Sequence, residues 1–472
     1  MIYSTDVAIV GGGPVGSLLA VLLRDMDLDV VVVERDLEPY QLPRAIVMDD
    51  EIQRVFHQHG MGAELSTMTT ALPGADFVDA EGNKVLGVDI PPVGLQGLPP
   101  VVCHYQPELD AMVQAQAEKR GSIFLRGRCA EGLEVRPNQV VLTLDDDSTV
   151  EARWLVGCDG ASSWTRRTVG LELEDLRFDQ QWLVVDLELH ESQMVNLPRV
   201  LQQICNPLRP VTFVPGHSRY RRWEFQIQPG EDVEALLQPS GLWSLLENWL
   251  TPDDAKIIRA AAYRFHAVVA PIMQSGPVFL AGDSGHQMPP FLGQGLNSGS
   301  RDAVNLAWKL ALVHQGRARE SLLDTYSSER VPHVRSTVEH AADMGRLIDQ
   351  LAGRESHGLD RSSGYGGERP QPSLVAGLVV PGHRFVGRPL PYHRQVYESL
   401  RVNGASFVIA TTDKTCAIPE ALSTWVSRIV PVEGDVIDNF YAAIIRPDGY
   451  VAALVNSRHE LETVSAQLKE LS

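Results

Sequence analysis

Three short stretches of the sequence combine residue types that suit a phosphate-bearing cofactor, and the first is the glycine turn at residues 11–16. It is a G-x-G-x-x-G pattern, and the acidic residue Glu34 follows it. In this pattern the first glycine allows a tight turn, the second brings bare backbone to a pyrophosphate, and the third lets the next helix pack close to the sheet. The free N–H groups at the start of that helix then face the phosphates. Glu34 stands where a carboxylate accepts hydrogen bonds from an adenosine ribose, so the stretch predicts a dinucleotide site.

Two later stretches have a similar character. Asp159-Gly160 follows one apolar run, and Gly282-Asp283 follows another. The second of them leads into Pro289-Pro290 and a glycine-rich segment at residues 293–299. Asp283 can hold a polyol chain, and the glycines expose backbone N–H groups at the start of a helix. Such a helix start suits an anionic reduced flavin, because the helix dipole stabilises the negative charge.

The elements that must position these turns are predicted from short apolar runs. Residues 7–10, 30–33, 154–156 and 278–281 are typical of buried parallel strands, and residues 17–23 are typical of a helix. Ligands of open α/β sheets bind at the carboxyl ends of the strands. Three turns at three such ends therefore predict one long cofactor that lies across the sheet.

The remaining chain predicts further β regions and a separate tail. Residues 74–103 are short apolar runs broken by Gly and Pro, and residues 182–228 alternate between apolar and polar, which indicates a mostly antiparallel sheet. Residues 350–372 have the composition of a linker, and the tail from about residue 378 carries its own strand and helix pattern. Helices are expected over about 108–119, 240–262 and 300–315.

Composition limits the classes of function. The chain has 472 residues, too many for one ordinary core. Its formal net charge of -19 argues against nucleic acid or an anionic membrane as a partner, and no apolar run reaches the length of a membrane span. The N-terminus runs directly into a predicted strand, so we expect no signal peptide. The five cysteines form no C-x-x-C, which fits a reducing cytoplasm and argues against a metal site.

Taken together, the motifs resemble a known enzyme family, the class A FAD-dependent aromatic hydroxylases of the p-hydroxybenzoate hydroxylase type. Over residues 1–340 the resemblance rests on the three turns with Glu34, Arg166 and Pro289-Pro290. A closer resemblance is to the 3-(3-hydroxyphenyl)propionate hydroxylase and phenol hydroxylase branch. The stretches that carry it are Pro43-Arg44-Ala45, Asp49-Asp50-Glu51, residues 203–210, 213–216 and 221–225, and residues 446–451 in the tail.

The resemblance implies an α/β fold. We expect a Rossmann-type FAD-binding domain, an inserted and mostly antiparallel substrate-binding sheet, and a small thioredoxin-like C-terminal domain. Because the tail has only Cys416 and no C-x-x-C, we expect that last domain to be structural, not redox-active. The expected boundaries are 1–75, 104–172 and 276–345 for the FAD-binding domain, 76–103 and 173–275 for the substrate-binding domain, 346–377 for a linker, and 378–472 for the thioredoxin-like domain.

The resemblance also implies an activity and its cofactors. NADPH or NADH reduces FAD, O2 adds to give a flavin C4a-hydroperoxide, and its distal oxygen attacks the ring of a phenolic substrate. The protein has to hold the flavin, exclude water and help the phenol lose its proton. Since the chain has a single dinucleotide fingerprint, we expect the nicotinamide to dock transiently. The implied partner is a small aromatic substrate, and whether the chain forms a homodimer stays open.

Site residues follow from the same resemblance. The cofactor set is expected to be Gly11, Gly13, Pro14, Val15, Gly16, Glu34, Arg35, Arg44, Gln106, Asp159, Asp283, Pro290, Gly293, Gly295, Leu296 and Asn297. The candidate catalytic residues are Asp49, His286 and Pro290. The candidates for the substrate pocket are Gln203, Arg209, Arg221, Trp223, Phe225 and Met288.

Several of these assignments have structural alternatives. Asp49 can instead cap the helix that follows it. The alternating Trp223 and Phe225 can belong to the core of the sheet, with Arg221 on a solvated edge. His286 can pack against backbone.

Other functions stay open at this point. The chain could hydroxylate a heteroaromatic or polyketide substrate, or it could bind flavin without hydroxylation, as an oxidase or a redox sensor. Gly282-Asp283-Ser284-Gly285 is not G-x-S-x-G, so a hydrolase is not supported. The complete glycine set and the Pro-Pro loop favour turnover over a degenerate binding module. Neither the identity of the phenol nor the choice between NADPH and NADH follows from the sequence.

Overall fold

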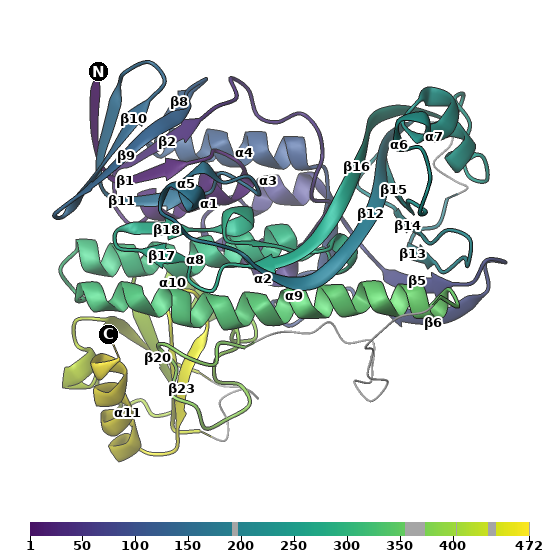
Figure 1. The fold of residues 1–472 in the computed structure, drawn as a ribbon. Coiled ribbons are helices and arrows are strands. Elements are labelled where there is room, and N and C mark those ends of the chain that lie inside the picture. Colours follow the sequence, from purple (N-terminus) through teal and green to yellow (C-terminus); the bar gives the residue numbers. More distant parts are fainter. Residues whose placement is uncertain (191–196, 355–372, 403, 433–439, 472) are drawn as a thin grey trace.

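The valine-rich runs near the N-terminus form the parallel centre of an eight-stranded sheet (Figure 1). The computed structural model describes residues 1–190, 197–354, 373–402, 404–432 and 440–471. Five strands pair in parallel, in the order β18-β11-β1-β2-β8. Their bounds are β1 (Ile2–Val10), β2 (Val30–Glu34), β8 (Ile123–Arg126), β11 (Thr149–Gly157) and β18 (Val278–Leu280). Antiparallel strands at the margins are β9 (Ala130–Arg136), β10 (Gln139–Leu144) and β17 (Gln274–Ser275).

Both faces of this first sheet are covered, which is why its strands are apolar throughout. Side chains such as Val7 and Ile9 pack on one face against the helices α1 (Pro14–Arg24), α4 (Gln106–Lys119) and α8 (Gly295–His314). Ala8 and Val10 point to the opposite face, where β9 and β10 fold over them. The helices start at the carboxyl edge of the sheet, where the predicted cofactor turns lie.

A second eight-stranded sheet curves away from the first, in the order β19-β16-β12-β15-β14-β13-β5-β6. All of its pairings are antiparallel except the one between β13 and β5. The short helices α6 (Val233–Leu236) and α7 (Pro239–Leu246) cover its outer side. The bounds are β5 (Gly74–Val78), β6 (Lys84–Asp89), β12 (Glu174–Leu189), β13 (Leu201–Ile204), β14 (Val211–Val214), β15 (Tyr220–Gln226), β16 (Ala255–Val269) and β19 (His286–Gln287).

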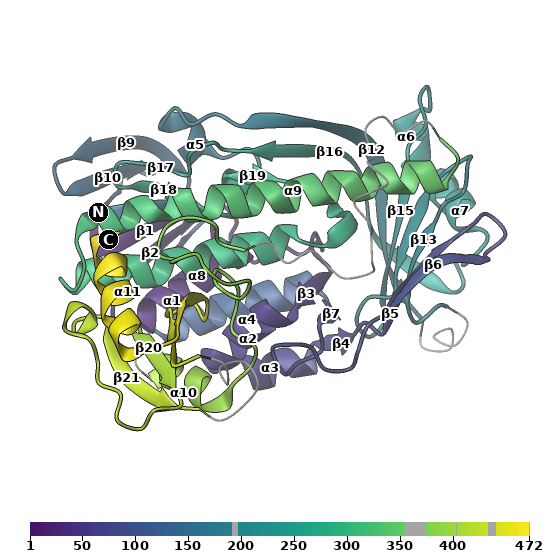
Figure 2. The same cartoon turned by 90° about the horizontal axis from the view of Figure 1, so that it is seen from below.

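Two smaller regions complete the fold. A three-stranded sheet of β3 (Val47–Asp49), β7 (Val101–His104) and β4 (Thr69–Ala71) lies beside α2 (Asp50–Gln58) and α3 (Gly62–Thr67). Figure 2 shows the long helix α9 (Thr325–Leu351) running past both large sheets. The C-terminal region is the predicted small thioredoxin-like unit, made of β20 (Phe407–Thr411), β21 (Val426–Pro431), β22 (Ala442–Ile445), β23 (Val451–Val455), α10 (Arg394–Val402) and α11 (Arg458–Glu470).

Three sequence expectations about elements need correction. The helix expected over 240–262 is wrong, because α7 ends at Leu246 and β16 begins at Ala255. Residues 260–262 are alanines with high helix propensity, but they pair with β12, so sheet formation overrides the local preference. Helix α8 starts five residues earlier than expected, at Gly295. Helix α9 continues to Leu351, inside the expected linker, and residues 355–372 lie outside the described residues.

Candidate active site

The ends of four parallel strands meet at one edge of the first sheet, which we call the cofactor edge. Val10 is paired with Val33 of β2 and with Gly157 of β11, and Gly157 is paired with Leu280 of β18. The residues that follow these four positions include the glycine turn, Glu34, Asp159-Gly160 and Gly282-Asp283. The structure therefore brings the three predicted turns together, although they are far apart in the sequence.

The glycines of the first turn do two different jobs. A Cβ atom on Gly16 would stand 2.0 Å from the carbonyl oxygen of Gly11, and one on Gly11 would stand 2.4 Å from the carbonyl oxygen of Cys158. Gly11 also has φ +103°, which favours glycine. A Cβ atom on Gly13 would meet no protein atom within 4 Å. Gly11 and Gly16 thus serve the packing of the chain itself, whereas Gly13 borders open space at the N-terminus of α1.

The Glu34 carboxylate is held against the glycine turn. Its two oxygens accept hydrogen bonds from the backbone N–H of Gly12 at 2.6 Å and from that of Asp36 at 2.9 Å. A carboxylate has further lone pairs, so Glu34 can still accept bonds from ribose hydroxyls. Arg35 differs, because its side chain is 71% exposed and stands 4.0 Å from Asp36. Arg35 therefore lies in solvent, away from the turn.

Gln106 supports a loop of the site through its side-chain amide. Its Oε1 accepts from the backbone N–H groups of Arg44 and Ala45 at 2.9 and 2.6 Å, and its Nε2 donates to Asp110 at 3.1 Å. The backbone of Arg44 is fixed in this way. Burial raises the pKa values of Asp110 and Asp283, and the nearby Arg44 guanidinium partly opposes that rise. Gln106 thus shapes the loop, and Arg44 is the cation available to a phosphate.

Asp159 shapes its own turn. Its carboxylate accepts from the Ser163 hydroxyl at 2.5 Å and from the backbone N–H and hydroxyl of Thr165 at 2.8 and 3.0 Å. These bonds fix the residues before helix α5 (Trp164–Thr168), and Gly160 at φ +75° presents bare backbone beside open space. Arg166 donates to the carbonyl of Ser284 at 2.9 Å, which ties this turn to the Gly282-Asp283 turn.

Asp283 lies at the cofactor edge, directly after Gly282. Its side chain is exposed, yet the surrounding protein desolvates the carboxyl group and raises its pKa. The backbone next to it is fixed from behind, because the N–H of Gly282 donates to Asp302 at 3.0 Å.

The glycine-rich loop after Pro289 forms the start of α8. Pro290 opens a single 3-10 turn (Pro290–Leu292), and Gly293 follows at φ +60°, where a Cβ atom would stand 2.1 Å from the side chain of Val47. Asn297 bridges two parts of this loop: its Nδ2 donates to the carbonyl of Gly293 at 2.7 Å, and its Oδ1 accepts from the backbone N–H of Asp49 at 3.0 Å.

The N–H groups of residues 295–297 precede the first intrahelical bond of α8, which runs from Ser298 to Gln294. A Cβ atom on Gly295 would meet no protein atom within 4 Å, so Gly295 borders open space at the start of α8. Leu296 packs partly against the main core. Backbone donors and a helix dipole at this point suit a flavin ring that becomes anionic on reduction.

The position of Asp49 disfavours its predicted catalytic role. Asp49 caps α2, because its Oδ1 accepts from the backbone N–H of Ile52 at 3.0 Å. Its Oδ2 accepts from Arg301 at 2.6 Å, and the side chain is 5% exposed. Both carboxylate oxygens of Asp49 are therefore used by groups of the chain itself, and the capping alternative is confirmed.

His286 is also placed behind the site. Its Nε2 lies 2.7 Å from Asp302, and both side chains are fully buried. Asp302 accepts from Arg330 as well, at 2.7 Å. This buried trio holds the Gly282 turn from behind, so the structural alternative fits His286 better than the role of a base in contact with substrate. Pro290, the third candidate, contributes loop geometry.

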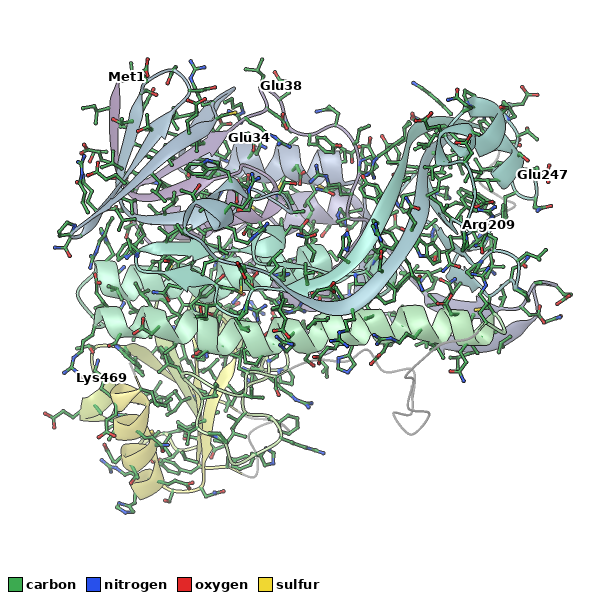
Figure 3. The ribbon with its side chains drawn as sticks, in the orientation of Figure 1. Met1, Glu34, Glu38, Arg209, Glu247 and Lys469 are labelled. Carbon is green, nitrogen blue, oxygen red and sulfur yellow. The ribbon has the colours of Figure 1, made fainter. Side chains whose placement is uncertain are left out.

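Five of the six pocket candidates do not gather at one place. Trp223 and Phe225 are buried in the core beneath α7, with the Trp223 ring 4.7 Å from that of Phe213, so they form sheet core as the alternative states. The Arg209 guanidinium is paired with Glu231, and Figure 3 shows Arg209 and Glu34 in different regions of the molecule.

The other two of these five are also engaged locally. Arg221 donates to nearby carbonyls at 2.7 and 2.9 Å, and Met288 packs in the cluster beside α9.

Gln203 lies on the opposite side of the second sheet, which we call the inner face. Strand register places Gln203 beside Thr212, Thr212 beside Glu224, and Glu224 beside Val184, so these four side chains form one row. Arg222 is two residues from Glu224 on β15 and shares its side of the strand.

Two contacts show which loops lie against the inner face. Arg222 donates to the carbonyls of Arg44 and Pro43 at 2.6 and 3.1 Å. Trp182, on the same side of β12, has its ring 5.3 Å from the ring of Phe291 in the Pro-Pro loop. The inner face therefore faces the cofactor loops, and Glu224 lies between these two points of contact.

Glu224 is the residue that sequence reasoning missed. It is 4% exposed, and the ion contact it makes among the described residues is a loose one, 3.9 Å from Arg222. Burial raises the pKa of Glu224 to about 7. The signal was the alternation Arg222-Trp223-Glu224-Phe225, in which the apolar members form core and the charged members share the other face. The sequence left the role of Glu224 unassigned, and the fold buries both Arg222 and Glu224.

The C-terminal region is joined to the same loops by buried polar groups. Tyr450 donates to Glu51 at 2.8 Å, and Glu51 also accepts from Arg301, the partner of Asp49. A second buried cluster places Arg446 2.7 Å from Glu329 of α9. The C-terminal region therefore contacts residues directly behind the glycine-rich loop.

The fold and the turns agree with what is found in other proteins. Residues 4–341 match the family described as FAD binding domain, and the chain belongs to that family. A relative from Rhodococcus jostii, a probable NADH-specific resorcinol 4-hydroxylase, is 37% identical over 350 residues, 73% of this chain and 66% of the relative. The 3-(3-hydroxy-phenyl)propionate/3-hydroxycinnamic acid hydroxylase of Escherichia coli is 36% identical over 353 residues, 73% of this chain and 63% of that protein.

Solved structures extend the comparison to the whole fold. The flavin-dependent monooxygenase PieE, in complex with FAD and substrate, matches 99% of both chains with a TM-score of 0.82 and 21% identity. The rebeccamycin biosynthetic enzyme RebC with reduced flavin matches 100% of both chains with a TM-score of 0.80 and 21% identity. Because these likenesses include the tail, the C-terminal region belongs to the shared architecture.

FAD fits the residues that are present. The open space at Gly13, the cation of Arg44, the exposed carboxylate of Asp283 and the N-terminus of α8 all belong to the cofactor edge. In the part of the chain that the structure describes, no helix is long and apolar enough to cross a membrane. No cluster of three or more His, Cys, Asp or Glu side chains suited to a metal ion occurs among those same residues.

Proposed function

We propose that the protein is an FAD-dependent, NAD(P)H-using aromatic monooxygenase that hydroxylates a phenolic substrate. The single observation that carries the proposal is that the inner face, a row of buried polar side chains on the second sheet, is directed at the glycine-rich loop of a FAD-binding fold. In this proposal a small aromatic molecule binds between these polar groups and the flavin end of the site.

The chain's own residues have four tasks in this proposal. Arg44, Gly13 and the N-terminus of α1 hold the pyrophosphate, and Asp283 holds the polyol chain. The α8 N-terminus orients the ring system and stabilises its charge. Trp182 and Phe291 close the side of the site with apolar surface, which excludes water. Bound FAD supplies the hydride acceptor and the activation of O2.

The substrate class is proposed from the relatives. Both relatives described above are named as hydroxylases of phenols, and one is named as NADH-specific. This chain spans 66% and 63% of their lengths, so its own phenol, its preference between NADH and NADPH and its partners form part of the proposal. We also propose the domain boundaries expected from the sequence, with the linker beginning after α9, and a cytoplasmic location in keeping with five free thiols.

Oxidation of NADH and NADPH by the FAD-loaded protein in air tests the proposal. The panel contains phenol, resorcinol, 3-(3-hydroxyphenyl)propionate and 4-nitrophenol, and product mass and hydrogen peroxide are followed together. We expect one phenol to accelerate oxidation and to gain one oxygen atom with little peroxide. Slow, phenol-independent oxidation that releases only peroxide would instead support the second candidate, a flavin-binding oxidase or sensor. Pyridine, quinoline and polyketide substrates are tried before that conclusion.

A further inference from the structure

The inner face of the second sheet contains a buried carboxylate, Glu224, that forms no close ion pair among the described residues. Glu224 lies in the row of Gln203, Thr212 and Val184. The other buried acid of this face, Asp186, is bound at 2.7 Å by Arg222 and at 3.3 Å by Arg259. Asp186 is thereby neutralised, whereas the ion contact of Glu224 among the described residues is the looser one with Arg222, at 3.9 Å.

The polar side chains next to Glu224 are bound to other groups. Arg222 directs its three nitrogens at Asp186 and at the carbonyls of Arg44 and Pro43, and approaches Glu224 only to 3.9 Å. Thr212 is closest in the row, but its hydroxyl donates to Gln203 at 2.6 Å. Among the described residues, no hydrogen bond to the Glu224 carboxylate is seen. Burying a carboxylate without a donor is costly, so a donor from outside the chain suits this position.

We propose that Glu224 receives the hydroxyl group of the phenolic substrate and acts as the proton acceptor for it. The proposal rests on the proposed function. In this step the O–H bond of the phenol breaks, its electron pair stays on the phenolate oxygen, and the proton forms a bond to a Glu224 carboxylate oxygen. The proton is returned to solvent or product before the next turnover, so no further reactant is needed.

Burial and three neighbouring charged groups set the pKa of Glu224, and with it the expected pH dependence of hydroxylation. The groups that act on it are Arg222 on its own strand, Asp186 on β12 and Arg259 on β16. Burial dominates them and raises the pKa of Glu224 to about 7. A proton acceptor must be ionised, so kcat/KM for the phenol is expected to rise as pH increases through about 7. A general base with a pKa near the working pH is efficient.

The test compares Glu224→Gln with wild type in the FAD-loaded full chain. We expect kcat/KM for the phenol that wild type hydroxylates to fall by about 10²- to 10⁴-fold. We also expect the rise in kcat/KM near pH 7 to disappear. FAD content and NADH oxidation without phenol should stay unchanged, because Glu224 does not touch the cofactor edge. Glu234→Gln is the matched control, since Glu234 is an exposed residue of α6 in the same region.

The results of this test distinguish a failure of the role of Glu224 from a failure of the proposed function. If wild type hydroxylates a phenol and Glu224→Gln keeps the pH profile and a kcat/KM within about twofold of wild type, Glu224 has no such role while the proposed function stands. If wild type hydroxylates no phenol of any class, the proposed function falls and this inference falls with it. Should Glu224→Gln lose FAD or unfold, Glu224→Leu replaces it, because it also lacks a group that can accept the proton. An unchanged pH profile with full activity in that variant overturns the proposal.

Discussion

The cofactor edge and the inner face are built in opposite ways. At the cofactor edge many binding groups are backbone groups, at glycines without Cβ atoms and at two helix N-termini, and the side chains of Glu34, Arg44 and Asp283 add to them. On the inner face they are side chains that come from four strands and are far apart in the sequence. Backbone binding requires glycine at fixed spacing and so leaves a motif, whereas a side-chain pocket leaves only an alternation that also fits ordinary sheet core. The cofactor edge can therefore be recognised in the sequence, whereas the inner face cannot.

The largest effect is expected from glycines of the first turn, which separate packing from cofactor binding. Gly16→Ala places a Cβ atom 2.0 Å from a backbone oxygen, so we expect a lower Tm and no FAD binding. Gly13→Ala meets no protein atom, so the apoprotein should keep its Tm while the Kd for FAD rises at least about tenfold. Thermal unfolding and FAD titration measure both. A Gly13→Ala variant with normal FAD affinity would contradict the placement of the pyrophosphate.

The second prediction separates the two faces of the second sheet. Trp223→Ala empties a fully buried position in the outer core, and we expect it to destabilise the protein by about 3–5 kcal/mol. Thr212→Val on the inner face should cost about 1 kcal/mol for the lost hydrogen bond and should change KM for the phenol. Denaturant unfolding and steady-state kinetics distinguish them. If Trp223→Ala leaves the stability unchanged, Trp223 is not part of the core and is again a candidate for the substrate pocket.

A third prediction uses the raised pKa of Glu224. Because its folded pKa is about 7 and its ordinary value is 4.5, the folded state holds a proton that the unfolded state releases between those two values. This group's contribution to stability is therefore lost as pH rises from about 4.5 to 7. Relative to wild type, Glu224→Gln should become more stable across that window, as measured by unfolding at each pH. A constant difference in stability would mean that the carboxyl group is not buried as described.

The smallest effect is expected where the C-terminal region meets the cofactor loops. Tyr450→Phe removes one hydroxyl that donates to Glu51, which costs about 1 kcal/mol. We also expect a several-fold weaker FAD affinity, since Glu51 and Arg301 support Asp49. Tyr397→Phe is the control, because the Tyr397 hydroxyl binds Leu390 and Gln96 instead. Equal effects of the two variants on FAD would show that this contact only holds the regions together.

Much of the fold follows from the sequence for one physical reason. Apolar strands such as Val30–Val33 and the tail strands around Ile409 and Ile444 are buried on both faces, so their position depends little on distant residues. The strand β16 could not be predicted, since its alanines favour a helix until β12 pairs with them. The roles of His286 and Asp49 could not be decided from the sequence, because their partners, Asp302 and Arg301, are brought to them only by folding.

The incorporation of ¹⁸O from ¹⁸O₂ tests the central claim most directly. The FAD-loaded protein is given NADH, the phenol that accelerates its oxidation, and an atmosphere of ¹⁸O₂ in ordinary water, and the product is analysed by mass spectrometry. The account predicts a hydroxylated phenol that carries one ¹⁸O atom for each NADH consumed. A product without ¹⁸O, or NADH consumption that yields only labelled hydrogen peroxide, would contradict it.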